Sequence, residues 1–309
     1  MFSPPSEMTS ALLALSNNLA DVVEQASRAV VAVNARHRIP SSGVHWRSGI
    51  VVTADHTIRR EEEITVTLPD NRTVPATLVG RDSSTDLAVL KLQEVELPTA
   101  EIGDPQLLKV GHMVLAVGRS GESGSSASLG VVSARGAWRS WRGSQIDQFI
   151  RLDLILYPGF SGGPLVEATG RVMGINTSGR HSMVLTIPAT TINRVIDQLL
   201  EKGRVTRGYL GLGMQPVLLP DALKNTLSLP SNGGVIVVSI EPDGSADRAG
   251  VLIGDVLLSL NGKPVSDTSD VQAMLGSESV GKTLSVKAVR GGALVELAIA
   301  VGERPWRQD

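Results

Sequence analysis

The chain has 309 residues, 42% of them apolar and 19% charged, a globular composition that excludes a disordered charged tail. With 29 Lys and Arg against 31 Asp and Glu, the net charge of −2 excludes a globally basic protein that binds nucleic acid. There is no cysteine, which excludes a disulfide scaffold, thiolate-bound zinc and a cysteine nucleophile. At roughly 150 residues per domain, the length predicts two domains.

The first predicted domain follows a helical segment. Residues 1–29 contain apolar side chains near helical spacing and are expected to form this N-terminal segment. From residue 30, short apolar runs separated by Gly, Pro and Asp predict an all-β barrel pair or sandwich. Residues 188–202 return to helical spacing and Gly203 is a natural helix stop, so the domain is expected to span residues 30–203.

A second domain is predicted after a short link at residues 204–207. Residues 208–303 combine short apolar runs with two short helices, one of them at residues 268–275, and a polar tail covers 304–309. No apolar run approaches the roughly 18 residues of a membrane helix, and the N-terminus lacks a signal peptide. The chain as it stands is therefore expected to be cytoplasmic, or periplasmic or otherwise extracytoplasmic if a leader was removed.

The sharpest local motif is the glycine-flanked serine of GFSGGPL at residues 159–165. Small neighbours leave the Ser161 hydroxyl clear and allow the backbone N–H groups of Gly159 and Ser161 to converge on one point, as an oxyanion requires. Taken alone, the same motif is equally typical of a Gly-rich turn that contains an incidental serine.

A serine nucleophile requires a base and a group that orients the base. His56 ends a strand-like run as it enters a polar turn, and Asp86 begins the apolar run LAVLKL. The order His56, Asp86, Ser161 is that of the chymotrypsin-type triad. The other histidines are better explained as surface or core residues; they are His37, His45, His112 and His181.

Residues 22–302 resemble the HtrA/Deg family of trypsin-like serine proteases. The segments SSGVHWRSGIVVTADHT, RDSSTDLAVLKL and PGFSGGPL are similar, in order and spacing, to the family's His, Asp and Ser motifs. The second unit resembles a PDZ domain through GYLGL and the long run from Gly234 to Val265. The resemblance implies a mainly β fold, with a chymotrypsin/trypsin-like double β-barrel followed by a PDZ domain.

The resemblance also implies roles for individual residues. Ser161 is the nucleophile, His56 the general base and Asp86 its orienting carboxylate. The oxyanion hole is formed by Gly159, Phe160 and Ser161, with Phe160 at a position where the family has asparagine. In the PDZ domain, consecutive N–H groups of a loop capture a peptide C-terminus, and the following helix lines the pocket for the last side chain. These residues are Tyr209, Leu210, Gly211 and Leu212 in the loop, and Val271, Met274 and Leu275 in the helix.

Specificity is predicted from position in the fold. The residue six before the nucleophile is expected at the floor of the primary pocket; here it is Ile155, followed by Leu156. The segment 176–179 is expected to form a wall, contributed by Asn176, Thr177 and Ser178. An apolar floor would leave a buried Lys or Arg unpaired, which favours small or medium apolar residues before the cut.

One basic stretch with aromatic residues lies at 134–145, and its charges include Arg139 and Arg142. By resemblance it is the family's sensor loop, which communicates with the active site. A nucleic-acid or anionic-lipid patch is the alternative, and the absence of a global positive charge argues against it.

The sequence thus predicts an ATP-independent serine endopeptidase that degrades unfolded or damaged proteins and binds C-terminal peptides at its PDZ domain. The alternative is a catalytically latent chaperone or scaffold that acts through the PDZ domain. No metal or other cofactor and no nucleic-acid partner is expected, and the resemblance implies a homotrimer.

Overall fold

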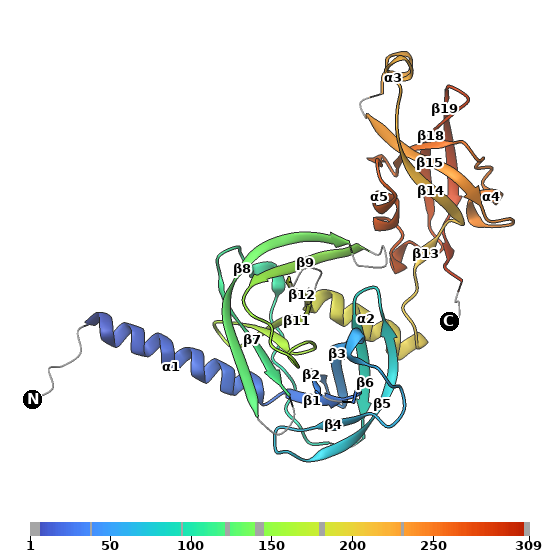
Figure 1. Ribbon diagram of the computed structural model, residues 1–309. Coiled ribbons are helices and arrows are strands. Elements are labelled where there is room, and N and C mark those ends of the chain that lie inside the picture. The colour runs from blue at the N-terminus through green and yellow to red at the C-terminus, as the bar shows by residue number, and fades with distance from the viewer. Residues whose placement is uncertain are drawn as a thin grey trace, which may run out of the picture. The chain divides into compact units, whose positions relative to one another are not determined.

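The computed structural model describes residues 7–305 except residues 38, 94, 121–123, 140–144, 179–182 and 230–231; of residues 7–9, 137–139 and 145–148 it describes the backbone alone. The chain forms two compact units, with residues up to 138 and residues 146–204 in the first and the residues from 205 onward in the second. The first contains two closed β-barrels with helices at both ends, and the second contains a β-sheet with short helices (Figure 1). The prediction of a mainly β, double-barrel fold with a second β-rich unit is confirmed.

The first barrel is closed in the strand order β1-β2-β3-β6-β5-β4. Its strands are β1 (Val30–Asn34), β2 (Ser41–Arg47), β3 (Ile50–Ala54), β4 (Thr65–Thr67), β5 (Thr73–Asp82) and β6 (Leu87–Leu92). β-Branched and leucine side chains fill the interior, which suits a small barrel whose inner face is packed rather than hollow. The buried residues include Val31, Val33, Val51, Ile64, Val66 and Leu90.

The second barrel is closed in the order β10-β11-β12-β9-β8-β7. Its strands are β7 (Met113–Arg119), β8 (Ser125–Arg139), β9 (Gln145–Asp153), β10 (Pro164–Glu167), β11 (Val172–Ser178) and β12 (Val184–Pro188). Its core contains Val114, Val132, Ile150, Leu165 and Met173.

The two barrels meet along strands β1, β2 and β7 and along β3 and β11. Every residue of β3 is buried, because one face of this strand lines the first barrel while the other faces the second. This explains why the sequence of β3, Ile-Val-Val-Thr-Ala, does not alternate between apolar and charged residues. The loops that leave β3 and enter β6 and β10 come together at this junction.

Two long helices flank the barrels. Helix α2 (Ala189–Lys202) buries Ile192, Val195, Ile196 and Leu199, and it ends at Gly203 with φ 67°, as the glycine predicted. Helix α1 (Glu7–Ser27) buries Val22 and Ala26 near its C-terminal end. The first half of α1 exposes apolar side chains, namely Leu12, Leu13 and Leu15. No helix in the described ranges is long and apolar enough to cross a membrane.

The second unit is built on a sheet in the order β14-β15-β16-β18-β19, with β17 paired to β16. The strands are β14 (Leu212–Leu218), β15 (Gly233–Ile240), β16 (Val256–Leu260), β17 (Lys263–Pro264), β18 (Thr283–Arg290) and β19 (Ala293–Ala300), with β13 (Gly208–Tyr209) paired to β20 (Gly302–Glu303). The helices are α3 (Asp221–Leu227), α4 (Ser245–Arg248) and α5 (Thr268–Ala273), so this unit has one helix more than expected.

Candidate active site

His56 and Asp86 are held together by the pairing of strands β3 and β6. His56 lies in the short 3-10 helix η1 (Asp55–Thr57) after β3, and Asp86 directly precedes β6, where its φ is 56°. One carboxylate oxygen of Asp86 accepts the backbone N–H of His56 at 2.8 Å, and the other contacts His56 Nδ1 at 2.8 Å. A carboxylate is an acceptor, so Nδ1 carries the proton and Nε2 is left with a lone pair.

A residue of the second barrel completes the carboxylate contacts. Thr177, in β11, is buried and donates its hydroxyl to the same Asp86 oxygen that receives His56 Nδ1. The prediction that Thr177 forms a pocket wall is therefore wrong. The reason is the alternation of side chains along β11, which turns Thr177 toward the barrel junction and leaves Ser178 at the pocket.

Asn176 is also not a pocket wall. Its side chain is fully buried, where Nδ2 donates to the Pro164 carbonyl at 2.8 Å and Oδ1 accepts from the Thr186 hydroxyl at 2.7 Å. It ties β11 to the strands on either side of it, β10 and β12. Residue 179 lies outside the described residues.

Ser161 lies in a turn that only glycine neighbours permit. Gly159 and Gly162 have φ values of 94° and 89°, in the region that disfavours side chains. A Cβ at Gly162 would lie 2.1 Å from the Ser42 carbonyl oxygen and 2.3 Å from Thr53 Oγ1. The close approach of this turn to β2 and β3 explains the glycines of GFSGGPL.

The backbone of this turn presents two unused donors. Within the described part of the chain, the N–H groups of Gly159 and Ser161 have no protein acceptor. The N–H of Phe160 between them donates to the Tyr157 carbonyl at 3.0 Å, and the Gly159 carbonyl accepts the Ser42 hydroxyl at 2.7 Å. Phe160 was expected in the oxyanion hole, and this is wrong because its N–H already closes a turn.

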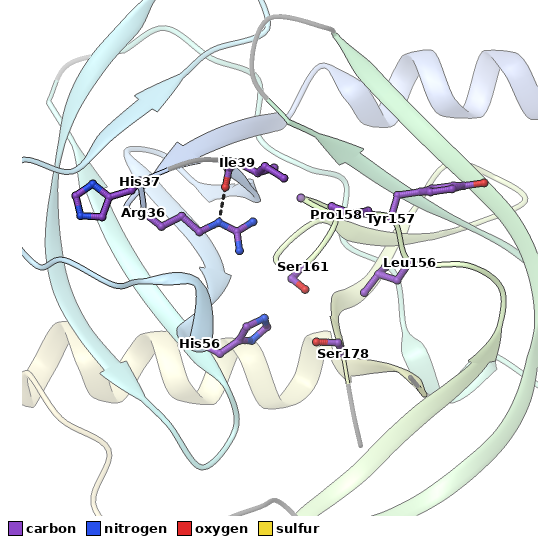
Figure 2. Close-up of a pocket in the computed structure, with 10 residues that line it drawn as sticks. Arg36, His37, Ile39, His56, Leu156, Tyr157, Pro158, Ser161 and Ser178 are labelled. Carbon is purple, nitrogen blue, oxygen red and sulfur yellow. Dashed lines mark hydrogen bonds between the residues drawn. The ribbon is translucent and has the colours of Figure 1, made fainter. Parts of the chain in front are cut away.

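Ser161 and His56 line one pocket of about 600 Å³ (Figure 2). One end of the pocket is formed by Leu156, Tyr157, Pro158, Gly159 and Ser178, and the other by Arg36, His37 and Ile39. No carboxylate lines this pocket in the described ranges, and no hydrogen bond there joins Ser161 to His56.

Ile155 does not form the pocket floor. Ile155 is 63% exposed and does not line the pocket, whereas Leu156 does. Leu154 and Leu156 both pack against the core of the second barrel, and Ile155 between them faces outward. The prediction for Ile155 was wrong, and the apolar character of this end of the pocket rests on Leu156 and its neighbours.

The loop at residues 209–212 has the properties of an anion-binding loop. The carbonyls of Leu210 and Gly211 accept the N–H groups of Ala246 and Glu241 at 2.9 and 2.8 Å. Their own N–H groups have no acceptor among the residues that the structure describes. Leu212 then starts β14, which lies at the edge of its sheet. The loop therefore offers fixed donors next to a free strand edge.

The predicted helix residues are divided between core and surface. Val271 was expected to line the peptide pocket. It is instead fully buried in the core of the second unit and cannot form a wall of such a pocket. Met274 and Leu275 are partly exposed and pack against that core. Of the predicted sensor loop, Arg142 lies outside the described residues, and the side chain of Arg139 is not described.

Both units of the chain match models of known protein families. Residues 41–175 match the family model of a trypsin-like peptidase domain, and residues 208–301 match that of a PDZ domain. A probable periplasmic serine endoprotease of DegP-like type from Pseudomonas fulva is 36% identical to this chain, over 84% of this chain and 54% of its own length. The chain thus spans about half the length of the curated relatives it matches.

Solved structures of similar proteins cover nearly the whole chain. The HtrA-type protease AlgW with a tripeptide is 32% identical, covers 93% of this chain and 98% of its own, and has a TM-score of 0.78. The serine endoprotease from Yersinia pestis is 30% identical, covers 98% of this chain and all of its own, and has a TM-score of 0.74.

Proposed function

The chain belongs to the HtrA-type, DegP-like serine proteases, and from that premise we propose that it is a serine endopeptidase with Ser161 as nucleophile. The observation that carries the proposal is the contact of Asp86 with both the backbone and the ring of His56, which lines one pocket together with Ser161. The proposal assigns His56 as base and Asp86 as its orienting carboxylate.

In the proposed reaction, Ser161 Oγ attacks the scissile carbonyl and His56 Nε2 accepts the hydroxyl proton. The imidazolium is stabilised by Asp86 and returns the proton to the leaving amine, and water then hydrolyses the acyl-enzyme by the reverse sequence. The N–H groups of Gly159 and Ser161 receive the negative charge on the carbonyl oxygen. Catalytic contacts such as Ser161 to His56 often tighten only in the substrate complex.

The proposed substrates are unfolded or damaged proteins, cut after small or medium apolar residues without any need for ATP. An extended segment must enter the cleft, which a folded protein does not offer. Leu156, Tyr157 and Pro158 support the apolar preference, because no described carboxylate in the pocket would pair with a Lys or Arg side chain.

Proteolysis of reduced, unfolded casein tests the enzymatic part of the proposal. The wild-type protein should degrade it, and Ser161→Ala or His56→Ala should lower turnover by a factor on the order of 10⁶. Mass spectrometry of the products should find Val, Ala, Leu or Ile before most cuts. Undiminished cleavage by His56→Ala would overturn the assigned mechanism, and cuts mostly after Lys or Arg would overturn the assigned pocket.

The second unit is proposed to bind the C-termini of peptides. The support is the pair of free N–H groups at Leu210 and Gly211 beside the edge strand β14, where a peptide can add as a further strand. The related protease AlgW has been solved with a tripeptide and with a decapeptide. Met274 and Leu275 are proposed to contact the last side chain of the peptide.

Calorimetry with one peptide in two forms tests the binding loop. A free-acid peptide with an apolar last residue should bind with micromolar affinity, and its amide should bind at least about tenfold more weakly, because a charged acceptor is lost. Equal affinities would show that residues 209–212 only connect strands. Peptide binding without any proteolysis would instead favour a latent chaperone or scaffold.

The proposal also includes a homotrimer and an extracytoplasmic location. The family resemblance implies the trimer, and the exposed Leu12, Leu13 and Leu15 of α1 offer apolar surface for assembly. The location is supported by relatives named as periplasmic. Sedimentation of the purified chain measures the oligomer, and a monomer at micromolar concentration would contradict it.

A further inference from the structure

The end of the catalytic pocket opposite Leu156 carries a positive charge. Arg36 lies in the loop between β1 and β2 and lines the pocket together with Ser161 and His56. Its guanidinium is held in place by the loop itself, because Nε donates to the Ile39 carbonyl and Nη2 to the Pro40 carbonyl. These contacts use backbone oxygens and leave further guanidinium N–H groups for a ligand.

In the described ranges Arg36 has no acid beside it, unlike Arg47 and Arg81 of the same barrel. Arg47 pairs with a carboxylate of α2, and Arg81 pairs with both Asp55 and Glu61. Within the described ranges, no carboxylate forms an ion pair with Arg36, although it is half-buried. An unpaired, partly desolvated cation is costly unless something pairs with it in the working state of the protein.

A second arginine strengthens the positive field around Arg36. The backbone N–H groups of Arg59 and Arg60 both donate to the Ala35 carbonyl, at 3.0 and 3.2 Å, which brings this pair next to the Arg36 loop. Burial and the charge of Arg59 lower the pKa of the Arg36 guanidinium, which still remains protonated at neutral pH. Nearby Glu61 is occupied by Arg81 and does not neutralise the group.

The position of Arg36 relative to the nucleophile assigns it to one side of the substrate. In Figure 2, Leu156 and Ser178 lie on one side of Ser161, and Arg36 and Ile39 lie on the other. If the residue before the cut enters the end lined by Leu156, an extended peptide that continues past Ser161 must pass the end lined by Arg36. Residues of an extended chain rise about 3.3 Å each, so one of the first few residues after the cut comes within reach.

We propose that Arg36, backed by Arg59, forms a carboxylate-binding subsite on the leaving-group side of the cleft, which selects acidic side chains among the first residues after the scissile bond. The inference rests on the proposed protease activity. Arginine suits this task because its planar guanidinium binds carboxylates through paired hydrogen bonds. The expected substrate segment is therefore apolar before the cut and acidic after it.

Quenched fluorescent peptides with blocked ends test the subsite in the full-length protein. Peptides that carry Glu or Gln at the first, second or third position after the cut are compared, and kcat/KM is measured for each. At one of these positions the wild-type protein should prefer Glu about three- to tenfold, because the ion pair is half-buried. Arg36→Gln should bring this ratio close to one, and 0.5 M NaCl should reduce it.

Two further variants separate the subsite from general effects. Arg36→Lys should retain part of the preference, because the charge stays while the paired geometry is lost. Arg72→Gln removes an arginine from an exposed turn, where it pairs with Asp70 and does not line the pocket, and should leave the ratio unchanged. The ratio compares two peptides on one enzyme, so a general loss of activity in a variant cancels out.

The outcomes distinguish the subsite from the protease activity. Equal cleavage of Glu and Gln peptides by the wild-type protein would overturn the subsite and leave the protease activity intact, whereas no cleavage of any peptide would overturn both. Peptides that end two residues after the cut, as free acid or amide, form a further arm. A preference found only for the free acid would assign the carboxylate to a chain end and overturn the choice of acidic side chains.

Discussion

Two adjacent serines at the start of β2 provide a matched test of how the oxyanion turn is held. Both Ser41 and Ser42 are fully buried. Ser42 Oγ donates to the Gly159 carbonyl at 2.7 Å and accepts the backbone N–H of Arg119 at 2.9 Å. Ser41 Oγ has no hydrogen-bond partner in the described ranges. Each substitution to alanine therefore removes one buried hydroxyl, which is hydrogen-bonded in Ser42 and has no described partner in Ser41.

The expected effects on stability differ in size. Ser42→Ala leaves a buried carbonyl and a buried N–H without this partner, and at about 1–2 kcal/mol for each, the lower part of the usual cost of an unsatisfied group, we expect a loss of about 2–4 kcal/mol. For a domain of this size, that corresponds to a melting temperature lower by about 4–16 °C. Ser41→Ala removes a hydroxyl that gains nothing from its surroundings, so its effect should lie within about 1 kcal/mol of zero.

The expected effects on catalysis differ as well. Through the Gly159 carbonyl, Ser42 fixes the turn whose N–H groups are proposed to receive the oxyanion. Loss of one such donor lowers kcat by about 10²–10³, so loosening the turn should lower kcat by about 10- to 100-fold with little change in KM. Peptide kinetics and thermal unfolding of both variants provide the assay. Equal behaviour of the two variants, or full kcat in Ser42→Ala, would show that Ser42 does not hold the turn.

Two further predictions concern the contacts of acidic side chains. Thr177→Val removes the hydroxyl that Asp86 accepts while it keeps the shape, and kcat/KM should fall about tenfold because a hydrogen bond to a charged group is lost; unchanged kinetics would contradict this role. In the second unit, hydrogen bonding to Arg290 lowers the pKa of the buried Asp255. The stability that this pair contributes is therefore fully present at pH values above the ordinary Asp pKa of about 4. It is lost as the pH falls through the lowered pKa of Asp255. The free energy of unfolding of this unit should fall less steeply with decreasing pH in Asp255→Asn than in wild type. Identical pH profiles would contradict the pair's role.

Local motifs predicted those parts of the site that depend on a few consecutive residues. The glycines around Ser161 and the polar turn at His56 are short-range signals, because they reflect backbone conformations that the neighbouring residues must permit. The structure brings His56 and Asp86 into contact through the pairing of β3 with β6, 30 residues apart in the chain. The order of the motifs and the family resemblance were enough to anticipate this pair.

Contacts that depend on barrel closure could not be predicted from the sequence. Thr177 reaches Asp86 across 91 residues, and Ser42 reaches Gly159 across 117. Nothing in the neighbourhood of either residue in the chain signals its partner. The position of Ile155 was misjudged for a related reason, because counting back from Ser161 does not reveal that Leu154 and Leu156 pack against the core while Ile155 is exposed.

In the second unit, the start of a helix was easier to predict than its end. Asp267 caps α5 with a side-chain hydrogen bond to the Ser269 N–H, and Asp270 completes a capping box, so the beginning at Thr268 was visible in the sequence. The helix ends at Ala273 rather than at the expected Leu275. The core of the second unit buries Val271 of this helix completely, which helical spacing alone did not predict.

Labelling with a fluorophosphonate probe tests most directly that the chain is a serine hydrolase with an activated nucleophile. Such probes react with a serine only where a neighbouring base and oxyanion donors activate it. We expect one adduct in the wild-type protein, located on Ser161 by peptide mass spectrometry, absent in Ser161→Ala and strongly slowed in His56→Ala. No labelling of the folded wild-type protein, or an adduct that persists at another serine when Ser161 is replaced, would contradict it.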